Sequence, residues 1–224
     1  MLLGLDVGGT FTDAVIIDGH RVVATAKRRT TKDNLMNGIG EALDAVLEGY
    51  DASNIEQVTL STTVVTNTIV EEKEQVVDLY VVTGPGRNVD DIFPVKPIYL
   101  QGYTDHRGIV VEHTPADAVR GIANMVQARS GTDLAAVSAK FGVRNPQEEL
   151  SITEELKNTY HTISNGSLLS GSLNFPRRTI SAYFNSAVTP VFTVFKKNVE
   201  DALSARNILA PLHILKADGG SLPM

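Results

Sequence analysis

Two short apolar runs open the chain, with a polar, glycine-containing segment between them. Residues 2–5 lead into Asp6, Gly8-Gly9-Thr10 stand in the middle, and residues 14–17 lead out. Two apolar runs joined by such a turn are typical of a β-hairpin. Residues 20–26 continue as a third antiparallel strand. The pattern therefore predicts three short strands at the N-terminus.

A helix and a strand–helix pair are predicted next. Apolar residues recur at every fourth position between 35 and 47, which places them on one helical face, and Asp33 or Asn34 is the candidate cap. Residues 55–60 indicate a strand, and residues 64–74 follow with a helical pattern.

The middle of the chain has the order β–α–β–α. Residues 76–82 are a continuous apolar run, as expected of a buried parallel strand, and residues 134–141 form another strand. Thr114 is expected to cap a helix with Pro115 in its first turn. Asn145-Pro146 opens a second helix. This stretch is expected to form a separate lobe.

The last part combines a loop, a long helix and a strand. Residues 165–176 are rich in glycine, serine and asparagine, which predicts a loop. A helical pattern covers residues 177–206, and Pro190 should kink it or divide it into two helices. Residues 212–215 form the last predicted strand, and residues 216–220 close the chain.

Composition excludes several classes of protein. The 224 residues are 42% hydrophobic, enough for one large or two small domains. The formal net charge of −6 predicts no nucleic-acid partner, and Lys27-Arg28-Arg29 is interpreted as a solvated strand end. The absence of cysteine excludes a disulfide framework and fits a cytoplasmic protein. No apolar run has the length of a membrane span, and residues 2–5 are too short for a signal peptide, so no membrane partner is expected.

Candidate chemistry gathers in the first turn. Two glycines without Cβ atoms let their backbone N–H groups approach an anion, and two threonines add hydroxyl donors for phosphate oxygens. Two aspartates supply carboxylates of the kind that hold the Mg²⁺ of a nucleotide. The six residues are Asp6, Gly8, Gly9, Thr10, Thr12 and Asp13. We interpret them as a phosphate-and-magnesium loop; a tight hairpin with exposed threonines is the alternative.

Two further polar segments are candidates. Ser61-Thr62-Thr63 stands between a predicted strand and a predicted helix, where unpaired helix N–H groups favour anions. Simple capping of that helix by threonine is the alternative. Asp218-Gly219-Gly220 forms either a plain turn or another anion loop.

The string GLDVGGTFTD, residues 4–13, resembles the first phosphate loop of the actin-like ATPase superfamily. Its ending resembles more narrowly the hydantoinase/oxoprolinase family. Thr62-Thr63 followed by Asn67 resembles the Thr-Thr motif of that family, although Leu60-Ser61 stands where the family has His-Gly. Residues 216–221 resemble the family's Ser-Asp-Gly-Gly loop, which opens the second half of the ATPase. The resemblance therefore covers the first half of a family member.

The resemblance implies an α/β fold. A ribonuclease-H-like (actin-like ATPase) lobe has a mixed β-sheet flanked by helices, and a second, smaller α/β region accompanies it. Residues 1–83 would begin the lobe, and residues 84–175 would form the inserted or second region. Residues 176–224 would return to the lobe and end at the start of a second phosphate loop.

The resemblance also implies roles for single residues. Asp6 would hold Mg²⁺ directly or through water, and Asp13 would orient a water molecule or the metal. The residues implied to contact phosphate are Gly8, Gly9, Thr10 and Thr12. The residues implied to line the cleft near the transferred group or the substrate are Thr62, Thr63 and Asn67. The start of the second phosphate loop would be Asp218, Gly219 and Gly220.

Family members hydrolyse cyclic amides such as hydantoins and 5-oxoproline with ATP, or belong to ATP-dependent ketone carboxylases. The implied function is the N-terminal part of an ATP-dependent hydrolase of cyclic amides that activates its substrate with phosphate. ATP and Mg²⁺ are the implied cofactors, and a second hydantoinase subunit and an oligomer are the implied partners. Two alternatives stay open: a sugar or small-metabolite kinase of the same superfamily, and a non-catalytic nucleotide-binding subunit.

Overall fold

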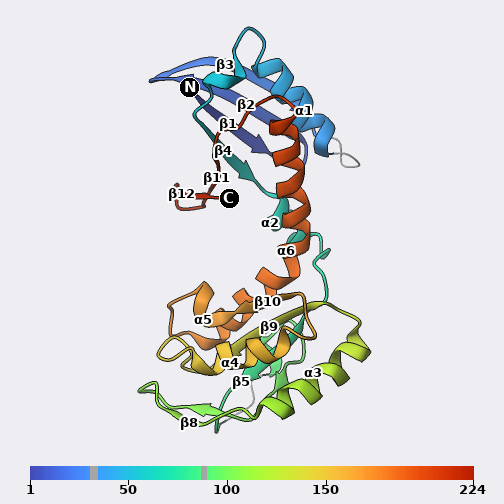
Figure 1. Cartoon of the computed structure of the whole chain (residues 1–224), viewed down its shortest axis with the longest axis vertical. Coiled ribbons are helices and arrows are strands. Elements are labelled where there is room, and N and C mark those ends of the chain that lie inside the picture. Colours follow the sequence, from blue (N-terminus) through green and yellow to red (C-terminus); the bar gives the residue numbers. More distant parts are fainter. Residues whose placement is uncertain (31–34, 87–89) are drawn as a thin grey trace. The chain divides into compact units, whose positions relative to one another are not determined.

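The computed structural model describes residues 1–30, 35–86 and 90–224. The chain divides into two compact units, whose elements are labelled in Figure 1. Unit 1 consists of Met1–Glu72 and Val191–Met224, and unit 2 consists of Lys73–Pro190. These units are defined by contacts within each of them, and the domain boundaries expected after residues 83 and 175 stay a prediction.

Unit 1 contains a mixed six-stranded sheet in the order β12-β11-β4-β1-β2-β3. Its strands are β1 (Leu2–Val7), β2 (Phe11–Asp18), β3 (Arg21–Arg29), β4 (Gln57–Thr62), β11 (Leu212–Leu215) and β12 (Ser221–Pro223). The first three strands pair antiparallel in sequence, with Leu2 opposite Ile17, so the predicted N-terminal strands are confirmed. Strands β1, β4 and β11 are parallel. Strand β12, which the sequence did not predict, pairs antiparallel with β11.

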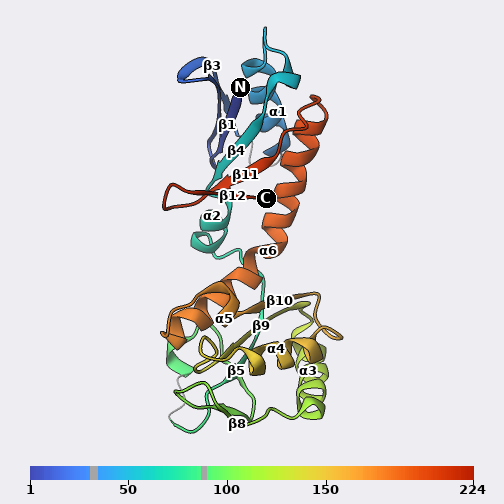
Figure 2. The ribbon, with the colours of Figure 1, turned by 60° about the vertical axis from the view of Figure 1, so that its left-hand side comes forward.

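Helices α1 (Leu35–Val46) and α6 (Phe175–Ser204) cover the same face of this sheet, as Figure 2 shows. Every second residue of β1, beginning with Leu3, is buried against them. Ile39 of α1 and Phe195 of α6 belong to the same core. The predicted caps Asp33 and Asn34 lie outside the described residues. A 3₁₀ turn, η1 (Ala52–Asn54), and the short helix α2 (Val64–Val70) complete the unit, and α2 is shorter than predicted.

Unit 2 is built on a parallel four-stranded sheet in the order β10-β9-β5-β6. The strands are β5 (Asp78–Val82), β6 (Ile98–Tyr99), β9 (Leu134–Ala139) and β10 (Thr162–Asn165). Helices α3 (Ala116–Ser130) and α4 (Gln147–Leu156) pack on one face with Tyr80, whereas the first half of α6 packs on the other face with Leu79. Both faces are covered, which explains the continuous apolar run predicted for β5.

Unit 2 also contains several smaller elements. A two-stranded sheet pairs β7 (Tyr103–Thr104) with β8 (Val110–Glu112). A 3₁₀ turn, η2 (Asp90–Ile92), follows β5, and a short helix, α5 (Gly166–Leu169), follows β10. Residues 165–176, predicted as a loop, therefore contain one helical turn.

One prediction about a helix end was wrong, and one of the two alternatives for the long helix does not hold. Thr114 does not cap α3: Pro115 is the N-cap residue, and the Thr114 hydroxyl donates to the carbonyl oxygen of Gln101 at 2.6 Å. The Thr114 hydroxyl thus donates to a distant carbonyl oxygen and does not accept from a backbone N–H of α3. Pro190 does not divide the long helix, because α6 continues through it. The kink, which is the other predicted alternative, stays a prediction. A single proline removes only one helical hydrogen bond, and buried residues on both sides, Ala187 and Phe195, hold the helix in place.

No helix among the described residues is long and apolar enough to cross a membrane.

Candidate functional site

The predicted motifs of unit 1 follow three parallel strands at their carboxyl ends. Val7 at the end of β1 lies beside Thr62 at the end of β4, and Leu60 lies beside Ile214 of β11. The carboxyl ends of β1, β4 and β11 therefore share one side of the sheet. Ligands of open α/β sheets bind in the crevice outside such ends.

The first turn and the Thr-Thr motif touch each other there. A Cβ atom on Gly9 would lie only 3.2 Å from the amide nitrogen Nδ2 of Asn67. The Thr62 hydroxyl donates to the carbonyl oxygen of Val7 at 3.0 Å. The structure thus brings together two segments that are more than fifty residues apart in the sequence.

In the glycine turn, the described residues supply an acceptor for one backbone amide and none for the other. The Gly8 N–H donates to the carbonyl oxygen of Phe11 at 3.0 Å, which closes the turn. The Gly9 N–H has no acceptor among residues 1–30, 35–86 and 90–224. Thr10 is exposed, and its carbonyl oxygen accepts from the Thr30 N–H. The geometry favours Gly9 and Thr10 over Gly8 for an anion contact.

The two aspartates lie opposite each other on the sheet face that α1 and α6 leave uncovered. Asp6 is the cross-strand partner of Asp13 in the β1–β2 register. Lys27 of β3 pairs with both carboxylate oxygens of Asp13 at 3.0 Å. The exposed Asp6 carboxylate has no hydrogen-bond or ion-pair partner within the described part of the chain. A cavity of about 450 Å³ opens beside these residues, and its other lining residues include Thr59, Ser61 and Leu215.

Thr12 does not line the cavity beside Asp6 and Asp13. Its side chain is fully buried on the helix-covered face, where its hydroxyl lies 3.0 Å from the hydroxyl of Thr30. This position does not favour the phosphate contact expected from the sequence.

The Thr-Thr motif makes local hydrogen bonds. The Thr62 hydroxyl accepts from the Val64 N–H at 3.2 Å, whereas Thr63, the N-cap residue of α2, makes no side-chain capping hydrogen bond. The exposed Thr63 hydroxyl accepts from Asn67 Nδ2 at 3.1 Å. The helix that follows has only seven residues, so its dipole is small.

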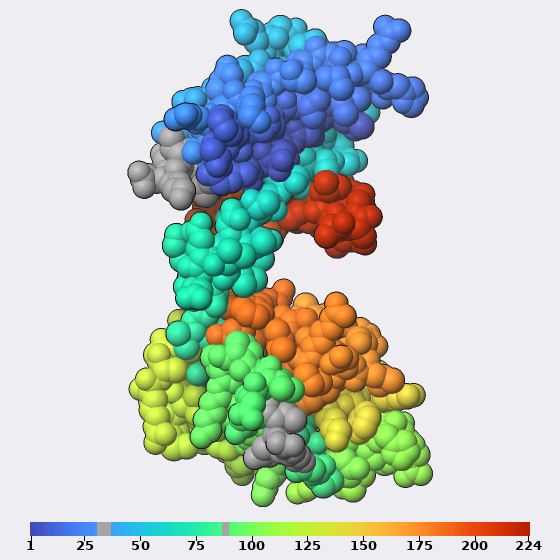
Figure 3. All heavy atoms as spheres, turned by 180° about the vertical axis from the view of Figure 1, so that it is seen from behind, coloured from blue at the N-terminus to red at the C-terminus, as the bar shows by residue number. Residues whose placement is uncertain are grey.

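Asp218-Gly219-Gly220 forms the turn between β11 and β12. Gly219 has a φ of +85°, and the Asp218 carboxylate accepts from the Gly220 N–H and from Lys216 Nζ, both at 2.9 Å. The backbone hydrogen bond from Gly220, followed by the one from Lys216, holds the pKa of Asp218 below its usual value. Figure 3 shows this C-terminal hairpin projecting from unit 1. The segment is a plain turn in this structure, and its role as a second phosphate loop stays a prediction.

A family model of the hydantoinase/oxoprolinase N-terminal region matches residues 2–160. The chain belongs to the hydantoinase/oxoprolinase family. This confirms the family that the sequence resembled. A comparison with curated proteins found no significant match.

Solved structures show the fold of this family member. The nucleotide-free structure of acetone carboxylase, from work on ATP-dependent acetone carboxylation, has a TM-score of 0.79 over 100% of the chain at 17% identity. The ATP-dependent caprolactamase from Pseudomonas jessenii has a TM-score of 0.76 over 99% of the chain at 18% identity. The chain covers 37% and 36% of those two chains. The chain shares its mixed α/β fold with these two enzymes, which confirms the expected fold class.

The donor set of this hydantoinase-family chain suits Mg²⁺ with a nucleotide. Within the described residues, no group of three or more histidine, aspartate or glutamate side chains could hold a metal alone. Mg²⁺ needs only one or two protein carboxylates when phosphates supply further ligands. Asp6 is the carboxylate that would fill this role, since Asp13 is already paired with Lys27.

Lys27 is the site residue that sequence reasoning did not identify. It was interpreted only as part of a solvated strand end, and it is indeed exposed. The cross-strand register of β2 and β3 places it opposite Asp13. Pairing the two strands around Gly19 is the signal that would have found it.

Proposed function

We propose that this chain supplies the phosphate- and magnesium-binding part of an ATP-dependent enzyme that hydrolyses cyclic amides of the hydantoin or 5-oxoproline class. Membership of the hydantoinase/oxoprolinase family supports the enzyme class. The two similar structures are described as ATP-dependent enzymes, one a carboxylase and one a caprolactamase. Because the chain covers little more than a third of each, the whole reaction requires more than these residues alone.

One observation carries the proposal: the first turn and the Thr-Thr motif meet at the carboxyl ends of β1 and β4. The free Gly9 amide and the exposed Thr10 hydroxyl would donate to the terminal phosphates. Asp6 would hold the accompanying Mg²⁺, whose charge would stabilise the negative charge that develops on the transferred phosphate. Thr63 and Asn67 would contact the same group from the second segment.

Lys27 has an electrostatic role in this proposal. Two carboxylates opposite each other in an antiparallel pair repel one another. The ion pair with Lys27 neutralises Asp13, which leaves a single free carboxylate, Asp6, for the metal. Lys27 thereby reduces the negative charge beside the turn, which would otherwise repel the phosphates of a nucleotide.

Calorimetric titration with Mg·ATP tests whether the chain binds a nucleotide at this site. We expect the 224-residue chain to bind weakly and to release no phosphate, because part of the neighbouring enzymes is absent from it. Asp6→Asn should reduce the Mg²⁺-dependent share of the binding. Asp18→Asn is the matched control, since Asp18 is an exposed carboxylate at the other end of β2. Micromolar binding by the chain alone, or equal effects of both variants, would contradict the proposal.

Product analysis tests the reaction class in a longer family protein that contains this region. Incubation with ATP and hydantoin, 5-oxoproline or a sugar distinguishes the alternatives. A ring-opened amide with inorganic phosphate supports the proposed hydrolase. A stable phosphorylated sugar would show a kinase instead.

A further inference from the structure

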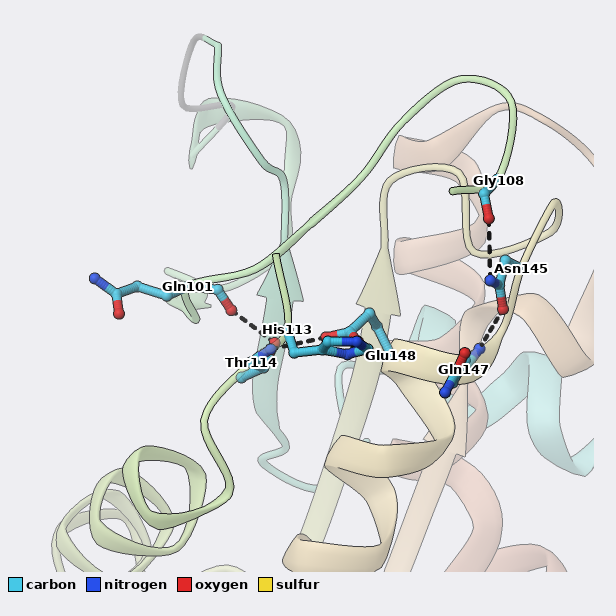
Figure 4. A network of polar contacts seen from close by, with 7 residues as sticks. All are labelled: Gln101, Gly108, His113, Thr114, Asn145, Gln147 and Glu148. Atoms are coloured by element: carbon cyan, nitrogen blue, oxygen red, sulfur yellow. Dashed lines mark hydrogen bonds and ion pairs between the residues drawn. The ribbon is translucent and has the colours of Figure 1, made fainter. Parts of the chain in front are cut away.

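A histidine and a buried glutamate form a pair in unit 2 that the proposed function does not use. His113 Nδ1 lies 2.6 Å from Glu148 Oε1, at the start of α4 (Figure 4). The Glu148 side chain is 1% exposed, whereas that of His113 is 68% exposed. An imidazole oriented by a buried carboxylate and open on its other side is the arrangement in which histidine acts as a general base.

The hydrogen bonds of Glu148 orient the His113 ring. The Thr114 N–H donates to Glu148 Oε2 at 2.9 Å, and Glu148 Oε1 faces His113 Nδ1. A neutral imidazole that donates from Nδ1 to an ionised carboxylate, which only accepts, keeps its lone pair on Nε2. Nε2 of His113 has no hydrogen-bond partner among residues 1–30, 35–86 and 90–224.

The pair lies at the carboxyl end of the parallel sheet. A Cβ atom on Gly102 would be 3.2 Å from Val82 Cγ1 and 3.5 Å from Glu148 Oε2. Val82 is the last residue of β5. The side of unit 2 on which His113 and Glu148 lie is therefore the one where the strands end.

Strand order gives a second, independent reason to place a site here. The chain runs from β5 to its neighbour β6 and then returns to β9 on the other side of β5. The direction of winding thus reverses between β5 and β9. Such reversals open a crevice outside the carboxyl ends, where α/β sheets bind ligands.

A cationic and strained segment borders the same place. The Lys140 N–H donates to the carbonyl oxygen of Val82 at 2.8 Å, and Lys140 Nζ lies 5.6 Å from the centre of the Phe141 ring. Phe141 has a φ of +65°, a left-handed conformation that is rare for an aromatic residue. Strained residues of this kind concentrate at ligand sites. The positive charge of Lys140 favours an anionic ligand.

We propose that His113 is the general base of a second small-molecule site, at the carboxyl ends of β5 and β9, for an anionic ligand with an acidic O–H or N–H group. Nε2 takes the proton, the ligand oxygen or nitrogen keeps the bonding electron pair, and the Glu148 carboxylate stabilises the imidazolium. The site is independent of the proposed nucleotide function, because all its residues belong to unit 2.

Reaction of the full chain with diethylpyrocarbonate, followed by mass spectrometry of each histidine, tests the base. His113 should react several-fold faster than the exposed His20, His106 and His161, because a carboxylate that orients a histidine raises the basicity of its ring. Glu148→Gln should lower the His113 rate to that of the other three and leave theirs unchanged. Glu154→Gln is the matched control, because Glu154 is an exposed carboxylate on the same helix.

Equal rates at His113 and the other exposed histidines would show that the pair only fastens the loop to α4, which overturns the proposal. If Glu148→Gln does not fold, long-range ¹⁵N–¹H spectra of the unmodified chain decide: a proton on Nε2 at neutral pH contradicts the proposal. Acetate, used as an anion probe against chloride at equal ionic strength, should slow modification of His113 and not of His106. Equal rates in both salts would overturn the assignment of an anionic ligand.

Discussion

The hydroxyl of Thr62 donates a 3.0 Å hydrogen bond to the carbonyl oxygen of Val7. It also accepts from the Val64 N–H, so one side chain joins the end of β1, the end of β4 and the start of α2. The glycine turn and the Thr-Thr motif therefore keep their relative positions through a single residue. Thr62 is better described as a positioning residue than as a ligand contact.

Thr62→Val should lower the free energy of unfolding by about 1 kcal/mol, the usual value of a hydrogen bond, and should weaken Mg·ATP binding. Thr62→Ser keeps the hydroxyl and should preserve both properties. Urea denaturation and calorimetric titration measure the two effects. If the valine variant binds and unfolds like the original chain, Thr62 does not position the turn.

Gly4→Ala should destabilise unit 1 by about 1–3 kcal/mol, the usual cost of overpacking. The new Cβ atom would lie 2.8 Å from Val15 Cγ1, and the β-branched valine has little freedom to move away. Gly121→Ala is the contrasting control, because nothing lies within 4 Å of its Cβ position in α3. That substitution should instead stabilise by about 1 kcal/mol, as alanine does in exposed helices. Thermal unfolding of both variants checks the opposite signs.

Asp105→Asn should reduce stability at neutral pH and have little effect in acid. The Asp105 carboxylate accepts from the Ile109 N–H and the Arg107 N–H, both at 2.9 Å, and from Arg107 Nε. The Ile109 hydrogen bond, followed by those from Arg107, holds the pKa of Asp105 below its usual value. A lowered folded-state pKa stabilises above the unfolded-state value of about 3.9, and the gain disappears as the pH falls through the folded-state pKa.

Denaturation curves of both proteins between neutral pH and about pH 3 measure this dependence. The difference between them should be constant above about pH 5 and should shrink in more acidic solution. A difference that persists unchanged in acid would mean that Asp105 acts through its shape and not its charge.

Tyr160→Phe should destabilise unit 2 by about 1–3 kcal/mol, because it removes the partner of the buried Tyr80 hydroxyl and leaves Asp78 with only its hydrogen bond from Ser130 among the described residues. The Tyr160 hydroxyl donates to Asp78 at 2.8 Å and lies 2.7 Å from the Tyr80 hydroxyl. Burial raises the pKa of Tyr80 to about 12, so both phenols stay protonated near neutral pH. Tyr103→Phe, at a tyrosine whose hydroxyl has no partner among the described residues, is the control for urea denaturation. Equal losses in both variants would contradict this account.

Much of the fold could be predicted because the deciding signals are local. The glycine turn between two apolar runs was enough for the β1–β2 hairpin, and the unbroken apolar run of residues 76–82 was enough for a strand covered on both faces. The three-residue strand β12 is exposed and ends at Pro223, so it carries no such pattern. The position of β12 is set by its pairing with β11, and the sequence does not show that pairing.

The site was predicted less well, because its contacts join distant segments. Asp6 and Gly9 were proposed from their residue types and from the family resemblance, and their roles stay predictions. The Asp13–Lys27 pair depends on strand register, and the Thr62–Val7 hydrogen bond joins two strands 55 residues apart. Thr12 was misplaced for a related reason: alternation along β2 turns its side chain toward the helices, although Asp13, the next residue in sequence, lines the cavity.

Unit 2 is one uninterrupted stretch of sequence set between the two pieces of unit 1. During synthesis on the ribosome, Lys73–Pro190 is complete before β11 exists, whereas the sheet of unit 1 must wait for Leu212–Leu215 to add its fifth strand. Since domains generally fold as they emerge, we expect unit 2 to reach its native state first and the N-terminal strands to await their last partners. A nascent chain of which residues up to about 190 have emerged from the ribosome would then contain a folded unit 2 and an incomplete unit 1 sheet.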